Sequence, residues 1–186
     1  LGLGDNAKQL KNWFEKAYLN HDNLAEATRF LANEIFGSHG LVIVDGDDPK
    51  LKNLFVPFIQ KELTEQNAQN EVAKSYNILK DYLIQVNPRE INLFYIENGL
   101  RERILFEDNR YKINHTNLEF SKDEILKLVE TNPEKFSPNV ILRPLYQEVI
   151  LPNLCYIGGG GELAYWLELK HVFSYFKVPF PMLLLR

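Results

Sequence analysis

The chain has a single cysteine, no long apolar run and no block of lysine or arginine. The lone Cys155 cannot form an intramolecular disulfide, and without clustered histidines beside it neither secretion nor a zinc site has support. No stretch is apolar over the length that spans a bilayer, and the charged, amphipathic start is unlike a signal peptide. A net charge of -4 without a basic cluster argues against a nucleic-acid partner. We therefore expect a cytoplasmic protein with no membrane or nucleic-acid partner.

The composition is that of a folded globular protein. Hydrophobic residues make up 45% of the 186 residues and charged residues 25%, close to the average for soluble domains. This length suits one compact domain with an insert, or two small domains that share a core. The chain closes on VPFPMLLLR, an apolar run without a polar tail, so we expect it to be an internal piece of a longer protein.

The first part of the chain combines helical periodicity with one apolar run. Apolar residues recur at helical spacing over 10–18 and again over 24–35, which predicts two helices. Residues 40–44, Gly-Leu-Val-Ile-Val, are typical of a strand buried on both faces of a parallel sheet. Asp48 and Pro49 follow as the N-cap and first-turn proline of a further helix.

Residues 62–137 predict an inserted α+β subdomain. Asn98-Gly99, between two apolar runs, predicts a hairpin with a two-residue type I′ turn, in which both turn residues have positive φ. A further strand is predicted at residues 111–113. Ser121 and Glu124 form a capping box that opens a short helix.

The last part of the chain alternates strand, helix and strand. Residues 153–157 predict a buried strand, 158–161 a glycine turn, 162–176 an amphipathic helix and 182–185 another strand. A strand–helix–strand unit of this length predicts a right-handed parallel crossover. The predicted fold class is therefore α/β: a Rossmann-like parallel sheet with flanking helices, formed by residues 1–61 and 138–186 and interrupted by the inserted subdomain with its antiparallel hairpin.

The glycine segment is the strongest candidate site. Gly158, Gly159, Gly160 and Gly161 lie between a predicted strand and helix, where backbone N–H groups and the helix N-terminus favour an anion, and Glu162 follows in the first helical turn. The alternative is a tight turn that needs glycine for packing alone. A P-loop is excluded, because the lysine and the serine or threonine that it requires are absent.

The same segment matches a relaxed dinucleotide fingerprint. Gly159 to Ala164 satisfy G-x-G-x-x-A, which is a weak pattern by itself. Glu162 places negative charge where a pyrophosphate would bind, and Arg186 stands where NAD-binding folds carry an acidic residue. An NADP-binding oxidoreductase half-domain is therefore an alternative function.

Further polar residues lie near the predicted strand ends and the last helices. Arg143 offers a guanidinium that binds carboxylates, and its alternative role is a salt bridge at a helix start. The acidic turn at 45–48 lies where open α/β sheets bind ligands, and its alternative role is helix capping and turn formation. With these we include as candidate substrate-binding residues Arg143, Gln147, Asn139, Tyr165, Asp45 and Asp47.

The histidines and the cysteine do not predict a metal or a nucleophile. The four histidines are spread over separate elements, with no carboxylate at ligand spacing. Cys155 alternates within a predicted buried strand, where a small apolar packing role is expected. The catalytic acid and base are not assigned.

The sequence resembles the bacillithiol cysteine-adding enzymes. SPNVILRPLYQEVILPNLCYIGGGGELAYWLELKHVFSYFKVPFPMLLLR is similar to the core of that family, FGSHGLVIVDGDDPKLKNLF to its strand and acidic turn, and FYIENGLRERI to its inserted hairpin. The resemblance implies a Rossmann-fold core interrupted by connecting-peptide subdomains, and a ligase that joins cysteine to glucosaminyl-malate through an amide bond. ATP or another nucleotide would suit the activation of a carboxyl group in such a fold.

The chain also departs from the family pattern. A TGQQ-like strand turn, an EDHD-like segment and a long C-terminal coiled coil, through which the full-length enzyme is expected to form homodimers, do not occur in these 186 residues. The family more often has Gly-Gly-Pro-Gly-Glu where this chain has Gly158 to Glu162. We therefore expect the chain by itself to be inactive. A non-catalytic scaffold domain is the remaining alternative.

Overall fold

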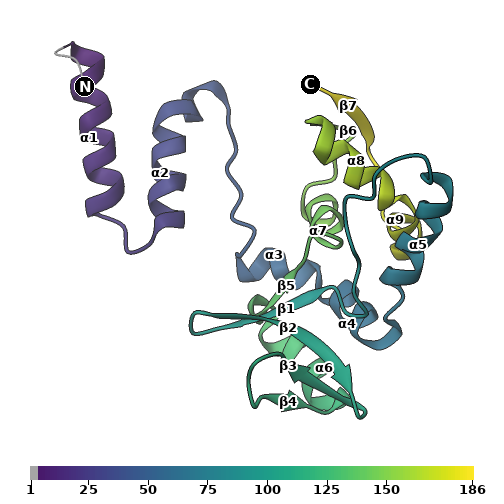
Figure 1. The fold of residues 1–186 in the computed structure, drawn as a ribbon. Helices are drawn as coiled ribbons and strands as arrows, with labels where there is room; N and C mark the ends of the chain where they lie inside the picture. Colours follow the sequence, from purple (N-terminus) through teal and green to yellow (C-terminus); the bar gives the residue numbers. More distant parts are fainter. Residues whose placement is uncertain (1–3) are drawn as a thin grey trace. The chain divides into compact units, whose positions relative to one another are not determined.

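The computed structural model describes residues 4–186. They divide into two compact units, the first ending at Gly46 and the second running from Asp47 to Arg186. Figure 1 shows the helices and strands of each. Within the described residues, no helix is both long and apolar enough to cross a membrane.

The first unit contains the two predicted helices, α1 (Asp5–Leu19) and α2 (Leu24–Phe36), which pack against each other. Asn23 caps α2, because its side chain accepts a hydrogen bond from the backbone N–H of Glu26 at 2.9 Å. A short 3₁₀ helix, η1 (Gly37–His39), ends at Gly40, which has a φ of +83°. The two helices are confirmed.

The strand predicted at residues 40–44 is wrong. This segment has no regular structure, and the side chain of Val42 is 80% exposed. A strand is stable where a neighbouring strand shares its backbone hydrogen bonds, and within residues 4–46 the structure describes no other strand. The apolar run therefore stays outside any sheet, with Leu41 and Val42 exposed and Ile43 and Val44 partly buried.

The second unit begins with three helices: α3 (Pro49–Leu54), α4 (Val56–Glu65) and α5 (Ala68–Ile78). The predicted cap at Asp48 is confirmed, because its side chain accepts from the backbone N–H of Lys50 at 2.8 Å. Helix α4 buries Ile59 and Leu63 completely.

A five-stranded antiparallel sheet follows, in the order β4-β3-β2-β1-β5. Its strands are β1 (Leu93–Glu97), β2 (Leu100–Glu107), β3 (Arg110–Ile113), β4 (Glu119–Phe120) and β5 (Phe136–Pro138). The predicted type I′ hairpin is confirmed, since Asn98 and Gly99 have φ values of +48° and +81° and Glu97 pairs with Leu100.

Along the chain, the strand β5 is preceded by the helices α6 (Lys122–Thr131) and η2 (Pro133–Lys135) and followed by α7 (Arg143–Ile150). Helix α6 packs against β3 and β4 and begins with the predicted capping box of Ser121 and Glu124. The 3₁₀ helix η2 leads into β5, and α7 follows it (Figure 1). Helix α7 begins at the predicted Arg143-Pro144.

The parallel part of the fold is a two-stranded sheet of β6 (Cys155–Gly158) and β7 (Met182–Leu185). Between them lie α8 (Gly160–Glu168) and α9 (Lys170–Phe176), which confirms the parallel crossover. The single helix predicted over 162–176 is interrupted at Leu169, whose N–H bonds to the carbonyl of Trp166, three residues back. The fold is mixed α/β, but most of its strand pairing is antiparallel.

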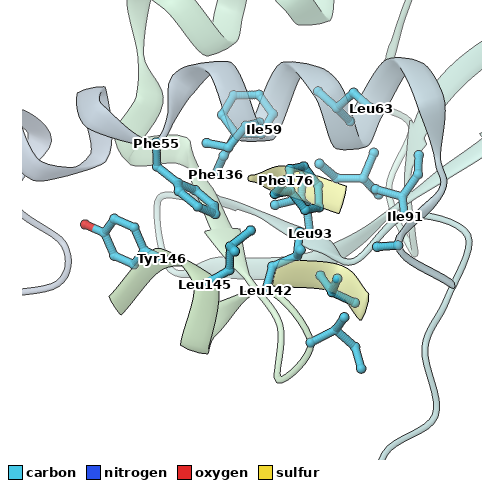
Figure 2. Packing of buried hydrophobic residues seen from close by; sticks show 14 of the residues in the cluster. Phe55, Ile59, Leu63, Ile91, Leu93, Phe136, Leu142, Leu145, Tyr146 and Phe176 are labelled. Carbon is cyan, nitrogen blue, oxygen red and sulfur yellow. The ribbon is translucent and has the colours of Figure 1, made fainter. Parts of the chain in front are cut away.

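One hydrophobic core runs through residues 47–186 (Figure 2). The ring of Phe55, at the start of α4, packs against the ring of Tyr146 in α7, with centroids 5.0 Å apart. The boundaries predicted for the inserted subdomain, 61/62 and 137/138, fall inside α4 and β5. Other core residues come from both predicted parts: Ile59, Leu63, Ile91, Leu93, Phe136, Leu142, Leu145 and Phe176.

Candidate functional site

The loop between β6 and α8 is shorter than the sequence predicts. Gly158 ends β6, Gly159 is the N-cap of α8, and Gly160 and Gly161 already belong to the first turn of the helix. None of the four has a positive φ. The predicted glycine turn at 158–161 is thus reduced to one junction residue, and positive-φ freedom is not what these glycines provide.

Close packing explains Gly158. A Cβ atom at this position would lie 2.9 Å from Cε1 of Tyr156, closer than real Cβ contacts allow, and 3.0 Å from Cδ2 of Leu163, which is tighter than most such contacts. A Cβ at Gly160 or Gly161 would meet no atom within 4 Å. The space beside Gly158 is occupied by the ring of Tyr156.

Tyr156 connects the strand to the helix that follows. Its ring stacks on the buried Trp166 of α8, with centroids 4.2 Å apart and planes 19° from parallel. Its hydroxyl donates a short hydrogen bond to Oε1 of Glu162. Burial, followed by the hydrogen bond and charge of Glu162, raises the pKa of Tyr156 to about 12. The phenol therefore stays protonated and holds the carboxylate in place.

Arg143 of α7 faces the same helix. Its Nη2 donates to the hydroxyl of Tyr165 at 2.6 Å, and its Nη1 donates to Oε1 of Gln147 at 3.1 Å. Nη2 also lies 3.9 Å from Oε1 of Glu162, and both side chains are partly exposed, at 43% and 40%. A cation and an anion are therefore adjacent at the surface without a direct hydrogen bond between them.

Four of the predicted site residues are thereby brought together: Arg143, Gln147, Glu162 and Tyr165. We call these four residues and Tyr156 the Arg143–Glu162 cluster. It presents a guanidinium, a carboxylate and two phenols at the N-terminal end of α8, close to the glycine junction. Such a set binds carboxylates, amines and hydroxyls, and it offers no obvious nucleophile.

Asn139, another predicted site residue, forms hydrogen bonds that stabilise a loop. Its side chain donates to Oδ1 of Asn92 at 3.0 Å and accepts from the backbone N–H of Ile141 at 2.8 Å. Asn92 is fully buried and in turn donates to Glu62. Both polar atoms of the Asn139 amide thus have partners, Asn92 just before β1 and Ile141 in the loop between β5 and α7.

The two predicted aspartates each lie beside a cation. Oδ2 of Asp45 is 3.0 Å from Nη1 of Arg29, and Oδ1 of Asp47 is 3.0 Å from Nζ of Lys52. Lys52 is only 2% exposed and also donates to the carbonyl of Phe136 at 2.8 Å. Asp48 acts as the helix cap described above. The role of Asp45 and Asp47 in a substrate site stays a prediction.

The sequence missed Tyr156 and wrongly predicted a buried Cys155. Cys155 is exposed, because β6 has helices on one face and its other face is open in the described residues. Tyr156 and Gly158, two residues apart, share the covered face, and this alternation was the available signal for Tyr156. Residues 4–186 contain no group of three histidine, cysteine, aspartate or glutamate side chains arranged to hold a metal.

Comparison with known proteins gives concordant matches over the full length of the chain. It is 64% identical over 186 residues to a protein of Flavobacterium psychrophilum and 60% identical over 186 residues to one of Flavobacterium johnsoniae. A Staphylococcus saprophyticus protein is 31% identical over 97% of the chain. All three carry the name "Putative cysteine ligase BshC".

These relatives are much longer than the chain, which spans 35% of the two flavobacterial proteins and 34% of the staphylococcal one. The family model described as "Bacillithiol biosynthesis BshC, N-terminal Rossmann-like domain" matches residues 1–186. These matches agree with the resemblance noted in the sequence. The chain therefore belongs to the BshC family of bacillithiol biosynthesis and corresponds to its N-terminal Rossmann-like domain.

Proposed function

We propose that this chain is part of a cysteine ligase that joins cysteine to glucosaminyl-malate by an amide bond, and that the Arg143–Glu162 cluster contacts a substrate. The names of the relatives support a ligase in the full-length protein. The single observation that carries the assignment of the site is the convergence of Arg143, Tyr165 and Glu162 at the glycine junction.

The chemistry of the cluster suits the proposed substrates. Cysteine and glucosaminyl-malate both carry carboxylates, and a guanidinium binds a carboxylate through parallel N–H donors. Arg143 is held in place by Tyr165 and Gln147 but remains 43% exposed. A substrate carboxylate would thus meet an oriented, accessible cation.

The remaining parts of the proposal concern the full-length enzyme. Amide formation requires an activated carboxyl group, so ATP or another nucleotide remains the proposed cofactor. We further propose that the enzyme acts in the cytoplasm and forms a homodimer through a coiled coil outside these 186 residues. An NADP-dependent oxidoreductase has less support, because the relatives are named as ligases.

The test is bacillithiol formation by an enzyme of full family length that carries this chain. Arg143→Ala and Glu162→Ala should each lower turnover at least about tenfold, the loss expected for a charged contact of about 1.4 kcal/mol or more in the transition state. The matched controls are Arg89→Ala and Glu130→Ala, at exposed positions away from the cluster. Unchanged turnover in both cluster variants would remove the assignment.

A further inference from the structure

The hydroxyl of Tyr165 has an unused hydrogen. A phenol has one donor and can also accept, and here the oxygen accepts from Nη2 of Arg143 at 2.6 Å. No hydrogen-bond acceptor for this hydroxyl is found among residues 4–186. Since Arg143 is a donor only, the hydroxyl hydrogen must point elsewhere. Arg143 and Tyr165 can therefore both donate to one ligand.

Arg143 also has donors to spare. A guanidinium carries five N–H groups, and the contacts to Gln147 and Tyr165 use two of them. A planar carboxylate needs two parallel donors, so the remaining groups of Arg143, together with Tyr165, are sufficient to bind one.

Glu162 is held close to Arg143 without pairing tightly with it. The separation of 3.9 Å exceeds the roughly 2.7–2.9 Å of a charge-assisted hydrogen bond. Tyr156 holds Glu162 on one side, while Tyr165 and Gln147 hold Arg143 on the other. The two opposite charges are thus adjacent, partly exposed, and each available to a ligand.

We propose that the Arg143–Glu162 cluster is the subsite for a zwitterionic α-amino acid, whose carboxylate binds Arg143 and Tyr165 while its ammonium donates to Glu162. This inference rests on the proposed function, since it selects the amino acid over the malate part of the second substrate as the occupant. An α-amino acid carries both charges on one carbon, which matches an adjacent cation and anion. A dicarboxylate would bring negative charge toward Glu162 and be disfavoured.

Tyr156 is the positioning residue of this subsite. It does not itself face the ligand in the proposal, but its hydrogen bond sets where the Glu162 carboxylate lies. Without that bond, the Glu162 carboxylate would lose its fixed position 3.9 Å from Nη2 of Arg143. Loss of the Tyr156 hydroxyl should therefore weaken recognition of the ammonium group while sparing that of the carboxylate.

Calorimetric titration of an enzyme of full family length that carries this chain, with three probes, tests this. L-Cysteine carries both charges, 3-mercaptopropionate lacks the ammonium group, and cysteamine lacks the carboxylate. L-Cysteine should bind at least about tenfold more tightly than either of the other two, because each charged contact is worth about 1.4 kcal/mol or more. Glu162→Gln and Tyr156→Phe should both reduce the preference for L-cysteine over 3-mercaptopropionate, whereas Glu130→Gln should leave it unchanged.

A second comparison separates this inference from the proposed function. Arg143→Lys and Tyr165→Phe should weaken L-cysteine and 3-mercaptopropionate alike, since both probes carry the carboxylate. Binding of L-malate that depends on Arg143 and exceeds that of L-cysteine would overturn the amino-acid assignment but leave a carboxylate subsite, as proposed above. Absence of saturable binding for all probes would also overturn it, while the turnover assay of the full-length enzyme tests the proposed function independently.

Discussion

Gly158 and Tyr156 are packed so closely that a Cβ atom on Gly158 would lie 2.9 Å from Cε1 of the tyrosine ring. The two residues are on the same face of β6, and the ring lies between that strand and Trp166 of α8. The absence of a side chain at Gly158 thus allows the Tyr156 hydroxyl to reach Glu162. A packing requirement in the strand is in this way connected to the geometry of the candidate site.

Gly158→Ala should destabilise the chain by about 1–3 kcal/mol, because the new methyl group must displace Tyr156 or Leu163. Gly161→Ala is the matched control. It lies in the first turn of α8 with open space around it, and alanine there should stabilise by about 0.5–1 kcal/mol. Urea unfolding measures both values. Equal effects of the two substitutions would contradict the packing role of Gly158.

The phenol of Tyr156 should ionise at a higher pH than that of an ordinary tyrosine. Its folded pKa of about 12 lies above the usual 10.0, so the stability linked to its protonated form is complete below pH 10 and is lost as the pH rises toward 12. The stability advantage of the parent over Tyr156→Phe should therefore shrink as the pH rises from 10 to about 12. Glu162→Gln should lower the Tyr156 pKa only in part, because burial is the larger cause. Phenolate absorbance and urea unfolding measure these effects.

Because of Glu62, the free energy of unfolding of the chain should depend on pH. It is fully buried beside Asn92, and this burial raises the pKa of Glu62 above its usual 4.5. A raised folded pKa means that its contribution is complete below 4.5 and is lost as the pH rises through the folded value. Glu62→Gln keeps an acceptor for Asn92 and removes the charge. The parent should thus gain stability relative to this variant as the pH falls from neutral toward 4.5, and a pH-independent difference would refute the prediction.

Lys52→Ala should cost about 1–3 kcal/mol of unfolding free energy. The ammonium group is buried and bonded to the carbonyl of Phe136, which loses this partner in the variant. Lys50→Ala, two residues earlier at an exposed position, should change the stability by less than about 0.5 kcal/mol. Thermal or urea unfolding of the two variants measures both changes. Similar losses of unfolding free energy in Lys52→Ala and Lys50→Ala would argue against the buried contact.

Local features were predicted best, because short-range physics determines them. The cap at Asp48, the capping box of Ser121 and Glu124, and the type I′ turn at Asn98-Gly99 each involve residues within a few positions of one another. Their hydrogen bonds form in the same way whatever surrounds them. The structure confirmed all three.

Features that depend on distant neighbours were predicted less well. Residues 40–44 have the composition of a buried strand but no described strand beside them, and Cys155 lies on the uncovered face of β6. The four consecutive glycines suggested a loop, yet two of them are helical. Whether an apolar run pairs or a strand face is covered depends on chain far away in sequence.

The candidate site shows the same division. Arg143, Gln147, Glu162 and Tyr165 were recognised individually from their positions at element ends, and the structure places them together. Asn139 had the same kind of position but holds a loop. Tyr156 was overlooked, because its hydrogen bond to Glu162 becomes visible when the strand and helix are packed.

The sequence by itself determined the local elements, the α/β class and the family, since helix caps, turns and motif order are properties of neighbouring residues. The tertiary structure alone decided that the sheet is mostly antiparallel, that Gly158 makes room for Tyr156, and that a guanidinium and a carboxylate stand 3.9 Å apart at the end of α8. Packing across long sequence separations sets these distances, and the order of residues along one segment does not contain them.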